Sequence, residues 1–252
     1  MKKVLFLLAV FLALMSACSV DDATAKLRKA AEKGDANAQY NLGMAYREGK
    51  GVKQDAVEAA KWFQKAADQG NVLGQFYLGL VYRAGEGSGL KQDLVEAAKW
   101  FQKAADQGNV DAQIFLGVAY LNGEGVIKDP VECEKLYRKA AEQGNADAQL
   151  ILGDAYFQGS GLKQDLVEAA KWLKKAAEQG NADAQLILGE AYSQGKGVIK
   201  DYVEAHARFN VAAAWGAKES AQARDLLGKE MSEEQIAEAT KRAHELLATI
   251  KK

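Results

Sequence analysis

Apolar residues recur along this chain of 252 residues in paired segments, at the three- and four-residue spacing of one helix face. A glycine-rich loop joins the two segments of each pair, and the first segment always contains leucine and glycine followed three residues later by tyrosine. The glycines of this motif are 36, 38, 36 and 36 residues apart, at Gly43, Gly79, Gly117, Gly153 and Gly189. A fixed period of this length predicts an all-α, right-handed α-solenoid of five helix-pair repeats, because no single pair can bury its apolar face alone.

Signals for helix ends recur with the same period. Asp165 opens a second helix and Glu168 follows three residues later, a spacing typical of a capping box. The single proline, Pro130, directly follows the corresponding aspartate of the third repeat, where its missing N–H group costs nothing. The second helices are expected to end at glycines, which are Gly70, Gly108, Gly144, Gly180 and Gly216.

These signals divide the chain into a solenoid over 25–216 and a helical cap over 217–252. A half-repeat precedes the first full repeat, and Ser232 with Gln235 opens a last helix that runs to Ile250. The cap is expected to be polar on one side, since the end of a solenoid must be soluble. The five repeats are expected at 35–70, 71–108, 109–144, 145–180 and 181–216.

The first residues predict a targeting segment rather than part of the fold. Residues 1–17 contain two lysines, an apolar stretch too short to span a bilayer and small residues before a cysteine. This pattern resembles a bacterial lipobox, in which Cys18 would be acylated and residues 18–24 would form a lipidated tether. Ser19 resembles the pattern of lipoproteins that leave for the outer membrane, so we expect an anchored envelope protein facing the periplasm. The alternative is an ordinary cleaved signal with an incidental cysteine.

The composition gives little reason to expect chemistry. The net charge of −1 gives no case for nucleic acid. Cys133 replaces an alanine of the other repeats, so a small buried thiol is expected, and after processing it has no partner for an intramolecular disulfide. His206 and His244 are expected on helix surfaces, without acid or cysteine at metal-ligand spacing. We therefore expect no metal, cofactor or catalytic residue.

The repeat resembles the Sel1-like family, a relative of the tetratricopeptide repeats. In the first repeat the resemblance rests on Ala38, Leu42, Gly43, Tyr46, Gly49, Gly51, Val52, Asp55, Ala59, Trp62, Ala66, Ala67 and Gly70. Members of that family are mostly scaffolds and adaptors, several of them in bacterial envelopes, so the resemblance implies a protein-binding function. Arg208 replaces the motif tryptophan in the fifth repeat and predicts a looser or partly solvated last interface.

In that architecture the first helices form the concave wall, and the motif indicates which residues face it. The early repeats place apolar and basic residues there, whereas the later repeats place acidic ones. The candidate partner-binding residues are Tyr40, Met44, Arg47, Leu73, Phe76, Leu80, Arg83, Ile114, Val118, Asp154, Phe157 and Glu190. An exposed apolar stripe of this extent would mark an interaction site for a protein or peptide. The alternative is that these residues pack between neighbouring first helices.

Two other functions are weighed against a monomeric scaffold. Some Sel1-like proteins have been described as β-lactamases, and Ser88 with Lys91 and Ser160 with Lys163 fit the S-x-x-K motif. Both pairs are expected in glycine loops, however, and the companion motifs of that enzyme class do not occur. Binding of peptidoglycan or another glycan would favour exposed tryptophans, but only Trp215 is not assigned to the repeat core.

Overall fold

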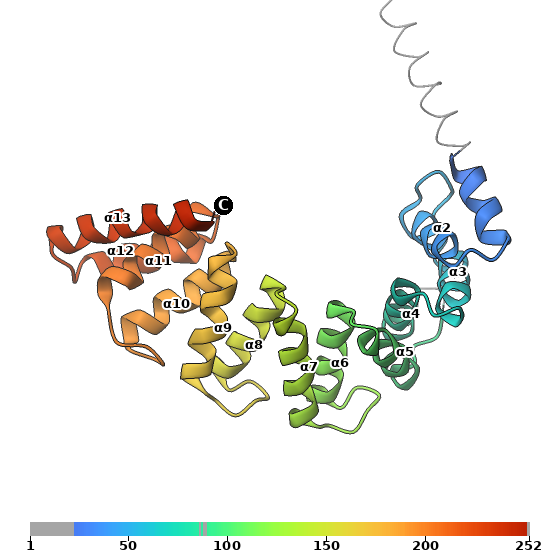
Figure 1. Ribbon diagram of the computed structural model, residues 1–252, viewed down its shortest axis with the longest axis horizontal. Helices are drawn as coiled ribbons and strands as arrows, with labels where there is room; N and C mark the ends of the chain where they lie inside the picture. The colour runs from blue at the N-terminus through green and yellow to red at the C-terminus, as the bar shows by residue number, and fades with distance from the viewer. Residues whose placement is uncertain (1–22, 86, 88–89, 251–252) are drawn as a thin grey trace, which may run out of the picture. The chain divides into compact units, whose positions relative to one another are not determined.

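The computed structural model describes residues 23–85, 87 and 90–250, and the regular elements in this part of the chain are all helices (Figure 1). The predicted signal peptide, Cys18 and most of the tether lie outside the described residues, as does Ser88. A helical segment at 23–32 comes first. The helices that follow are α2 (Ala36–Glu48), α3 (Ala56–Asp68), α4 (Val72–Ala84), α5 (Leu94–Asp106), α6 (Val110–Asn122), α7 (Pro130–Glu142), α8 (Ala146–Gln158), α9 (Leu166–Glu178), α10 (Ala182–Gln194), α11 (Tyr202–Ala214), α12 (Lys218–Gly228) and α13 (Glu233–Ile250).

The chain forms two compact units. Unit 1 comprises the chain up to Ala112 together with Glu124–Ile127, and unit 2 comprises Gln113–Gly123 and the chain from Lys128 onward. Within unit 1, α3 packs against both α2 and α4, and α4 packs against α5. Within unit 2 the same succession runs from α7 to α11, and α11 then packs against both α12 and α13. The predicted all-α fold of stacked helix pairs is confirmed.

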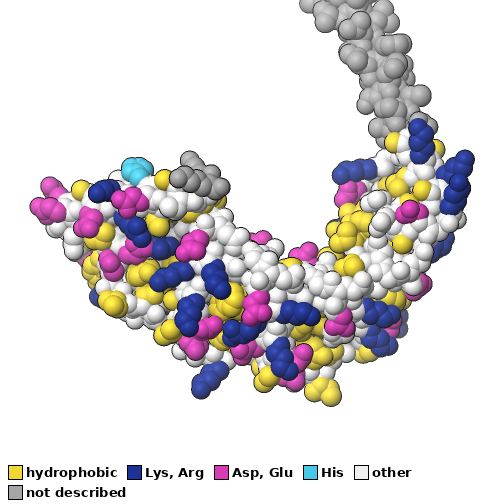
Figure 2. Space-filling view, viewed as in Figure 1, with side chains coloured by type: hydrophobic (Ala, Val, Ile, Leu, Met, Phe, Trp, Pro, Cys, Tyr) yellow, Lys and Arg dark blue, Asp and Glu magenta, His cyan; other side chains and the backbone are white. Residues whose placement is uncertain are grey.

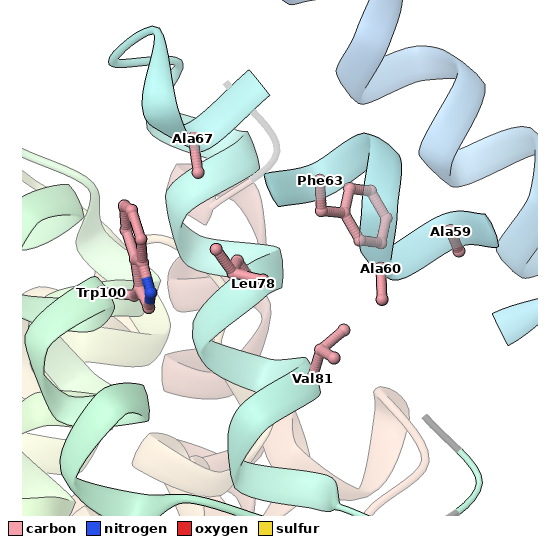
Figure 3. Packing of buried hydrophobic residues seen from close by; sticks show 7 residues of the cluster. All are labelled: Ala59, Ala60, Phe63, Ala67, Leu78, Val81 and Trp100. Carbon is pink, nitrogen blue, oxygen red and sulfur yellow. The ribbon is translucent and has the colours of Figure 1, made fainter. Parts of the chain in front are cut away.

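The glycine of the leucine–glycine motif allows the two helices of a pair to touch. A Cβ atom added at Gly79 would lie 2.6 Å from the Phe101 ring of α5. At Gly153 it would lie 2.8 Å from Cγ of Leu173 in α9. Figure 3 shows the resulting core of unit 1, where Leu78 and Val81 of α4 lie against α3. The constant glycine of the repeat is therefore a packing residue.

The tyrosine of the motif also has a structural role, through its backbone. Asp165 accepts hydrogen bonds from the N–H groups of Val167 and Glu168 at 3.1 and 2.9 Å, as an N-cap should. Its own N–H group, however, donates to the carbonyl oxygen of Tyr156 at 3.1 Å. The reciprocal half of the predicted capping box is therefore not formed. The Glu168 carboxylate instead accepts hydrogen bonds from Lys171, Trp172 and Arg138.

Within each unit, a buried glutamine of a first helix ties its repeat to the one before it. In unit 2 the side chain of Gln149 donates to the carbonyl oxygen of Ala141 at 3.2 Å. The Oε1 atom of Gln149 in turn accepts from Gln179 at 2.8 Å. The same arrangement joins Gln107 to Gln75 in unit 1 at 2.8 Å. Gln75 and Gln149 are buried, and because each of them both donates and accepts, burial leaves no part of either amide group without a partner.

The fifth repeat contradicts one expectation from the sequence. Arg208 is buried, with 7% of its surface exposed, so the predicted looser, partly solvated interface is wrong. Its guanidinium lies 2.6 Å from the Glu204 carboxylate and donates to Oε1 of Gln185 at 2.9 Å. Trp215 occupies the position at which the other repeats have the donating glutamine. Arg208 therefore supplies the donor that Trp215 cannot, and the interface stays closed.

Candidate functional site

The candidate partner-binding residues differ in their exposure to solvent from one repeat to another. Arg47 and Leu73 are exposed, and most of the other candidates in either unit are half-buried, namely Tyr40, Met44, Leu80, Arg83, Ile114, Val118, Asp154 and Glu190. Phe76 and Phe157 are buried, with 7% and 6% of their surfaces exposed. For these two rings the expectation of an exposed stripe is wrong. Phe76 packs against Tyr77 and Phe101, and Phe157 is buried with the Lys196 ammonium 5.7 Å from its ring centroid. Their burial agrees with the alternative of packing residues, but the ring contacts of Phe76 given above are with its own helix and with α5 rather than with a neighbouring first helix.

A cleft of about 520 Å³ lies in unit 1 between α2, α3 and α4. Its apolar lining comes from Phe63 and Ala59 of α3 and from Leu80, Val81 and Ala84 of α4. Arg47, Gln54 and Tyr77 also line the cleft and add polar groups to it. This volume falls within the range of roughly 300–1,000 Å³ that is usual for ligand-binding pockets. Figure 2 shows hydrophobic side chains gathered over this part of unit 1.

Three aromatic rings cluster at the cleft, where Phe63 and Tyr77 line it and Tyr40 lies beside them. Phe63 and Tyr77 stack with their centroids 5.3 Å apart and their planes at 24°. Tyr40 lies 5.6 Å from Tyr77 and 6.1 Å from Phe63. Burial raises the pKa of Tyr40, and the neighbouring Tyr77 adds to the rise, so its hydroxyl group remains protonated at neutral pH. Figure 3 shows Phe63 projecting from α3, with Val81 pointing toward Ala60.

Arg47 places a cation at the edge of this aromatic cluster. Its Cζ atom lies 4.9 Å from the centroid of the Tyr77 ring. Its Nη1 atom lies 3.8 Å from the sulfur of Met44. Gln54 donates to the backbone carbonyl oxygen of Arg47 at 2.9 Å, which fixes the end of α2 against the loop. Methionine, arginine and tyrosine in one place are typical of the residues that contribute most to protein interfaces.

A second cleft of about 540 Å³ adjoins the first in unit 1. The two clefts share Leu80 and Ala84, and the second is also lined by Arg83, Gln92, Leu94 and Glu124. Arg83 pairs with Glu124 at 3.4 Å, and both side chains are about one-third exposed. The C-terminal part of α4 thus forms a ridge with a hollow on each side.

The corresponding face of unit 2 has a different charge. Glu190 is half-buried, and burial together with the nearby Asp154 raises its pKa, whereas Lys196 lowers it. Lys196 also lies 5.7 Å from the centroid of the Phe157 ring. The acidic character predicted for the later repeats is therefore combined with a lysine from the following loop.

The sequence indicated part of the cleft but missed its central ring. Tyr40, Met44, Arg47 and Leu80 were expected on the face, and the structure places them in or beside the cleft. Tyr77 was missed, because the motif pointed to the residue just before it, and that residue is buried. The five repeats have Asn41, Tyr77, Phe115, Ile151 and Ile187 at this position. This variation among otherwise constant positions was the signal available in the sequence.

The two histidines and the remaining serine–lysine pair were the other residues considered for catalysis or metal binding. His206 is buried, so its predicted surface position is wrong, whereas His244 is exposed as expected. Burial lowers the pKa of His206, Arg224 lowers it further, and its Nδ1 atom lies 3.2 Å from Nδ2 of Asn210. Ser160 and Lys163 lie in the loop between α8 and α9, so they do not share a helical turn. In the described part of the chain no three ligand-type side chains are grouped to hold a metal ion.

The thiol of Cys133 is expected to be unreactive in the native protein. It is fully buried, and burial raises its pKa to about 11, whereas reaction with disulfide reagents requires the thiolate. A Cys18→Ser variant should therefore react slowly with Ellman's reagent at pH 8 and rapidly once unfolded in guanidinium chloride. Native reaction at the rate of a free thiol would contradict the buried assignment.

Stacked helix pairs with a glycine at each crossing define an α-helical repeat protein of the tetratricopeptide-like class. Residues 36–71, 72–109, 110–145, 146–181 and 182–207 match the Sel1 repeat, and the chain belongs to the Sel1 repeat family. Among curated proteins no match was found. None of the helices in the described part of the chain combines the length and the apolar character needed to cross a bilayer.

Solved structures support the same assignment. A Sel1 repeat protein from Oxalobacter formigenes is 32% identical, with a TM-score of 0.73 over 92% of this chain and 94% of that one. A protective antigen of uropathogenic Escherichia coli with an SLR fold is 33% identical, with a TM-score of 0.78 over 90% of this chain. This chain covers only 48% of the antigen. Repeat proteins of this kind are generally scaffolds for protein interaction.

Proposed function

We propose that this protein is an interaction scaffold of the bacterial envelope that binds a segment of a partner protein along the first-helix face of unit 1. The observation that carries this proposal is the cleft between α2, α3 and α4, which combines apolar walls with Tyr77 and Arg47. Constant residues of the repeat are used for packing, so the variable positions around the cleft are free to recognise a partner. Asp154 and Glu190 offer a separate acidic surface within unit 2.

The proposed anchor is a lipid on Cys18. Processing at this cysteine would attach three acyl chains, and several chains hold a protein at a membrane far more firmly than one. The basic residues, apolar stretch and small residues of 1–17 support this proposal, and Ser19 favours the outer membrane. The proposed arrangement is a monomer that faces the periplasm and takes no cofactor, metal or nucleic acid.

The anchor predicts incorporation of labelled fatty acid. Bacteria that express the full chain and are grown with tritiated palmitate should yield a labelled band. A Cys18→Ala variant at equal abundance should be unlabelled. A Cys133→Ala variant is the matched control and should retain the label. Equal labelling of the Cys18→Ala chain would refute the anchor, whatever the fate of the cleft.

The cleft predicts site-specific crosslinking. A photoreactive amino acid at Ala84, an exposed residue that lines both hollows of unit 1, should give a discrete adduct in living cells. The same amino acid at Lys61, exposed on α3 and outside the lining, should not. An adduct of the same size from both positions would mean nonspecific proximity, and no adduct from Ala84 would count against the proposal.

The two alternative functions have less support. Trp62, Trp100 and Trp172 are buried in the repeat core, and only Trp215, with 44% of its surface exposed, could stack on a sugar. Even that ring lies beside Gly180, where an added Cβ atom would collide with it. A hydrolase would need a serine activated by a nearby base, and Ser160 and Lys163 lie in a loop with both side chains exposed to water. Turnover of a chromogenic β-lactam by the mature chain would revive that alternative.

A further inference from the structure

Arg47 differs from most arginines of this chain because no carboxylate of the described residues pairs with it. Arg138, Arg208 and Arg242 each lie within 3.3 Å of a glutamate. The neighbouring Glu48 is engaged by Lys50 at 2.6 Å. The contacts of the Arg47 guanidinium within the described residues are with the Met44 sulfur and the Tyr77 ring. Its fork of N–H donors is therefore available to an incoming acceptor.

The position of Arg47 also decides which charge the cleft accepts. A guanidinium over the Tyr77 ring already uses the negative face of that ring, so a cationic group of a ligand would meet a like charge there. A carboxylate would meet planar, oriented donors whose positions are partly fixed by stacking. Ordering of the side chain before binding lowers the entropy cost of the new contact. An anion is the complementary partner.

Next to this cation the cleft is apolar and has room. Phe63, Leu80 and Val81 line it, while the small side chains of Ala56, Ala59 and Ala84 leave space above them. The volume of about 520 Å³ accommodates one large aliphatic or aromatic side chain with part of its backbone. Burial of such a side chain removes apolar surface from water, so the apolar group provides affinity and the carboxylate provides register.

The adjoining cleft indicates that the ligand chain continues. The two hollows share Leu80 and Ala84, so a segment seated in the first can pass over the ridge of α4 into the second. There Arg83 and Glu124 present one group of each sign. An acidic side chain at Arg47 leaves both ends of the segment free to continue, whereas a terminal carboxylate allows the chain to continue in one direction only. We therefore take an internal segment as the occupant, and amidation of a bound peptide separates it from a chain terminus.

From these observations, and resting on the proposed function, we propose that the cleft binds an internal partner segment in which an acidic side chain stands beside a large apolar one. The carboxylate pairs with Arg47, and the apolar side chain enters the space between Phe63, Leu80 and Val81.

The test uses the full chain carrying Cys18→Ser, which keeps it unlipidated in every arm. Random twelve-residue peptides displayed within a phage coat protein are selected on this chain, and the enriched sequences are synthesised with fluorescent labels. Enriched peptides should carry aspartate or glutamate within two positions of leucine, isoleucine, methionine, phenylalanine or tryptophan. Arg47→Gln should weaken their binding by about tenfold in fluorescence anisotropy. Arg28→Gln is the matched control, because Arg28 also contacts a tyrosine of unit 1, Tyr46, but lies outside the cleft lining, and it should leave binding unchanged.

Charge reversal makes the assignment specific. A peptide whose acidic residue is replaced by lysine should bind poorly to the chain that carries Arg47. The same peptide should bind more tightly to the Arg47→Glu variant. Amidation of the peptide's C-terminus should have no effect, whereas a loss of binding on amidation would identify a terminal carboxylate and overturn the internal segment.

Two outcomes distinguish the acidic partner segment from the proposed function of the cleft. Ala84→Glu places a charge on an exposed position of both clefts, so the chain should still fold, as circular dichroism would verify. Peptides that lose affinity for Ala84→Glu but bind Arg47→Gln as well as the natural chain would refute the acidic partner and leave the cleft intact. Peptides that bind Ala84→Glu undiminished, or a selection that enriches none, would refute the proposed function and this inference together.

Discussion

Replacement of Arg208 by leucine is expected to cost about 3 kcal/mol of folding free energy in unit 2, the largest effect of any single change considered for this protein. Arg208 and Glu204 are both nearly buried, with side-chain exposures of 9% and 12%. Removal of the guanidinium leaves a buried carboxylate without its main partner and Oε1 of Gln185 without its donor. The loss falls at the lower end of the range for broken buried pairs, because Arg242 still contacts Glu204 at 2.9 Å.

The measurement is urea unfolding of the full chain, followed by circular dichroism. Arg242→Leu is the matched control, since it removes a second arginine from the same glutamate, but that side chain is 44% exposed. Its loss should cost about 1 kcal/mol or less. Equal losses of folding free energy in the two variants would mean that the burial of Arg208 adds nothing to its contribution to stability.

The loss of folding free energy in the Arg208→Leu variant is expected to depend on pH. Burial alone would raise the pKa of Glu204, but Arg208 and Arg242 outweigh it and hold the pKa below its usual value of 4.5. A carboxylate whose folded pKa is lowered contributes stability above its unfolded pKa and loses it as the pH falls through the folded value. The difference in free energy of unfolding between the Arg208→Leu variant and the natural chain should therefore become smaller below about pH 4.5.

A double-mutant cycle tests the exchange of donors in the fifth repeat. Glutamine at position 215 would restore the donor that Gln179 supplies to Gln149 one repeat earlier. The cost of Trp215→Gln should be about 1 kcal/mol smaller in the Arg208→Leu background than in the natural chain. Strict additivity would contradict the idea that Arg208 compensates for Trp215.

Replacement of Gly153 by alanine is expected to destabilise unit 2 by about 1–3 kcal/mol, although alanine is the better helix former. The new Cβ atom would lie 2.8 Å from Cγ of Leu173 and 3.1 Å from the backbone nitrogen of the same residue. A side chain can turn aside, but the backbone of α9 cannot move without disturbing its packing on α8. The helices would have to separate.

Gly228→Ala provides the matched control in the same unit. This glycine also follows a leucine and is the last residue of α12, and an added Cβ atom there would find its nearest neighbour, Nε2 of His206, at 3.6 Å. The substitution should be neutral or stabilising by up to about 1 kcal/mol. The unfolding temperatures of the two variants should shift in opposite directions. Shifts in the same direction would show that helix propensity rather than packing determines the effect of both substitutions.

Much of the fold could be predicted from the sequence because its signals are local and repeated. Aspartate and asparagine N-caps, a proline at the first helical position and glycines in left-handed conformations act within a few residues of their own positions. Five copies of the same signals then fixed the order of the helices. Asn145 caps α8 and accepts a hydrogen bond from the N–H group of Ala148 at 2.9 Å, and Ser232 and Gln235 exchange hydrogen bonds at the start of α13.

The candidate site could be predicted only in part. The motif indicated which helix face to inspect, and Arg47 and Leu80 line the cleft found there. It did not indicate depth, so Phe76 was expected to be exposed while the adjacent Tyr77, which lines the cleft, was missed. Exposure depends on the side chains of neighbouring repeats, which differ from copy to copy.

The sequence by itself determined the all-α class, the period of the helix pairs, the helix ends and the burial of Cys133. Each of these follows from interactions between residues close in the chain or from a pattern repeated five times. Only the tertiary structure decided that Arg208 closes the last interface, that His206 is buried and that Arg47 stacks on Tyr77 without a carboxylate partner among the described residues. These outcomes depend on which side chains from different helices meet, and no local rule specifies that meeting.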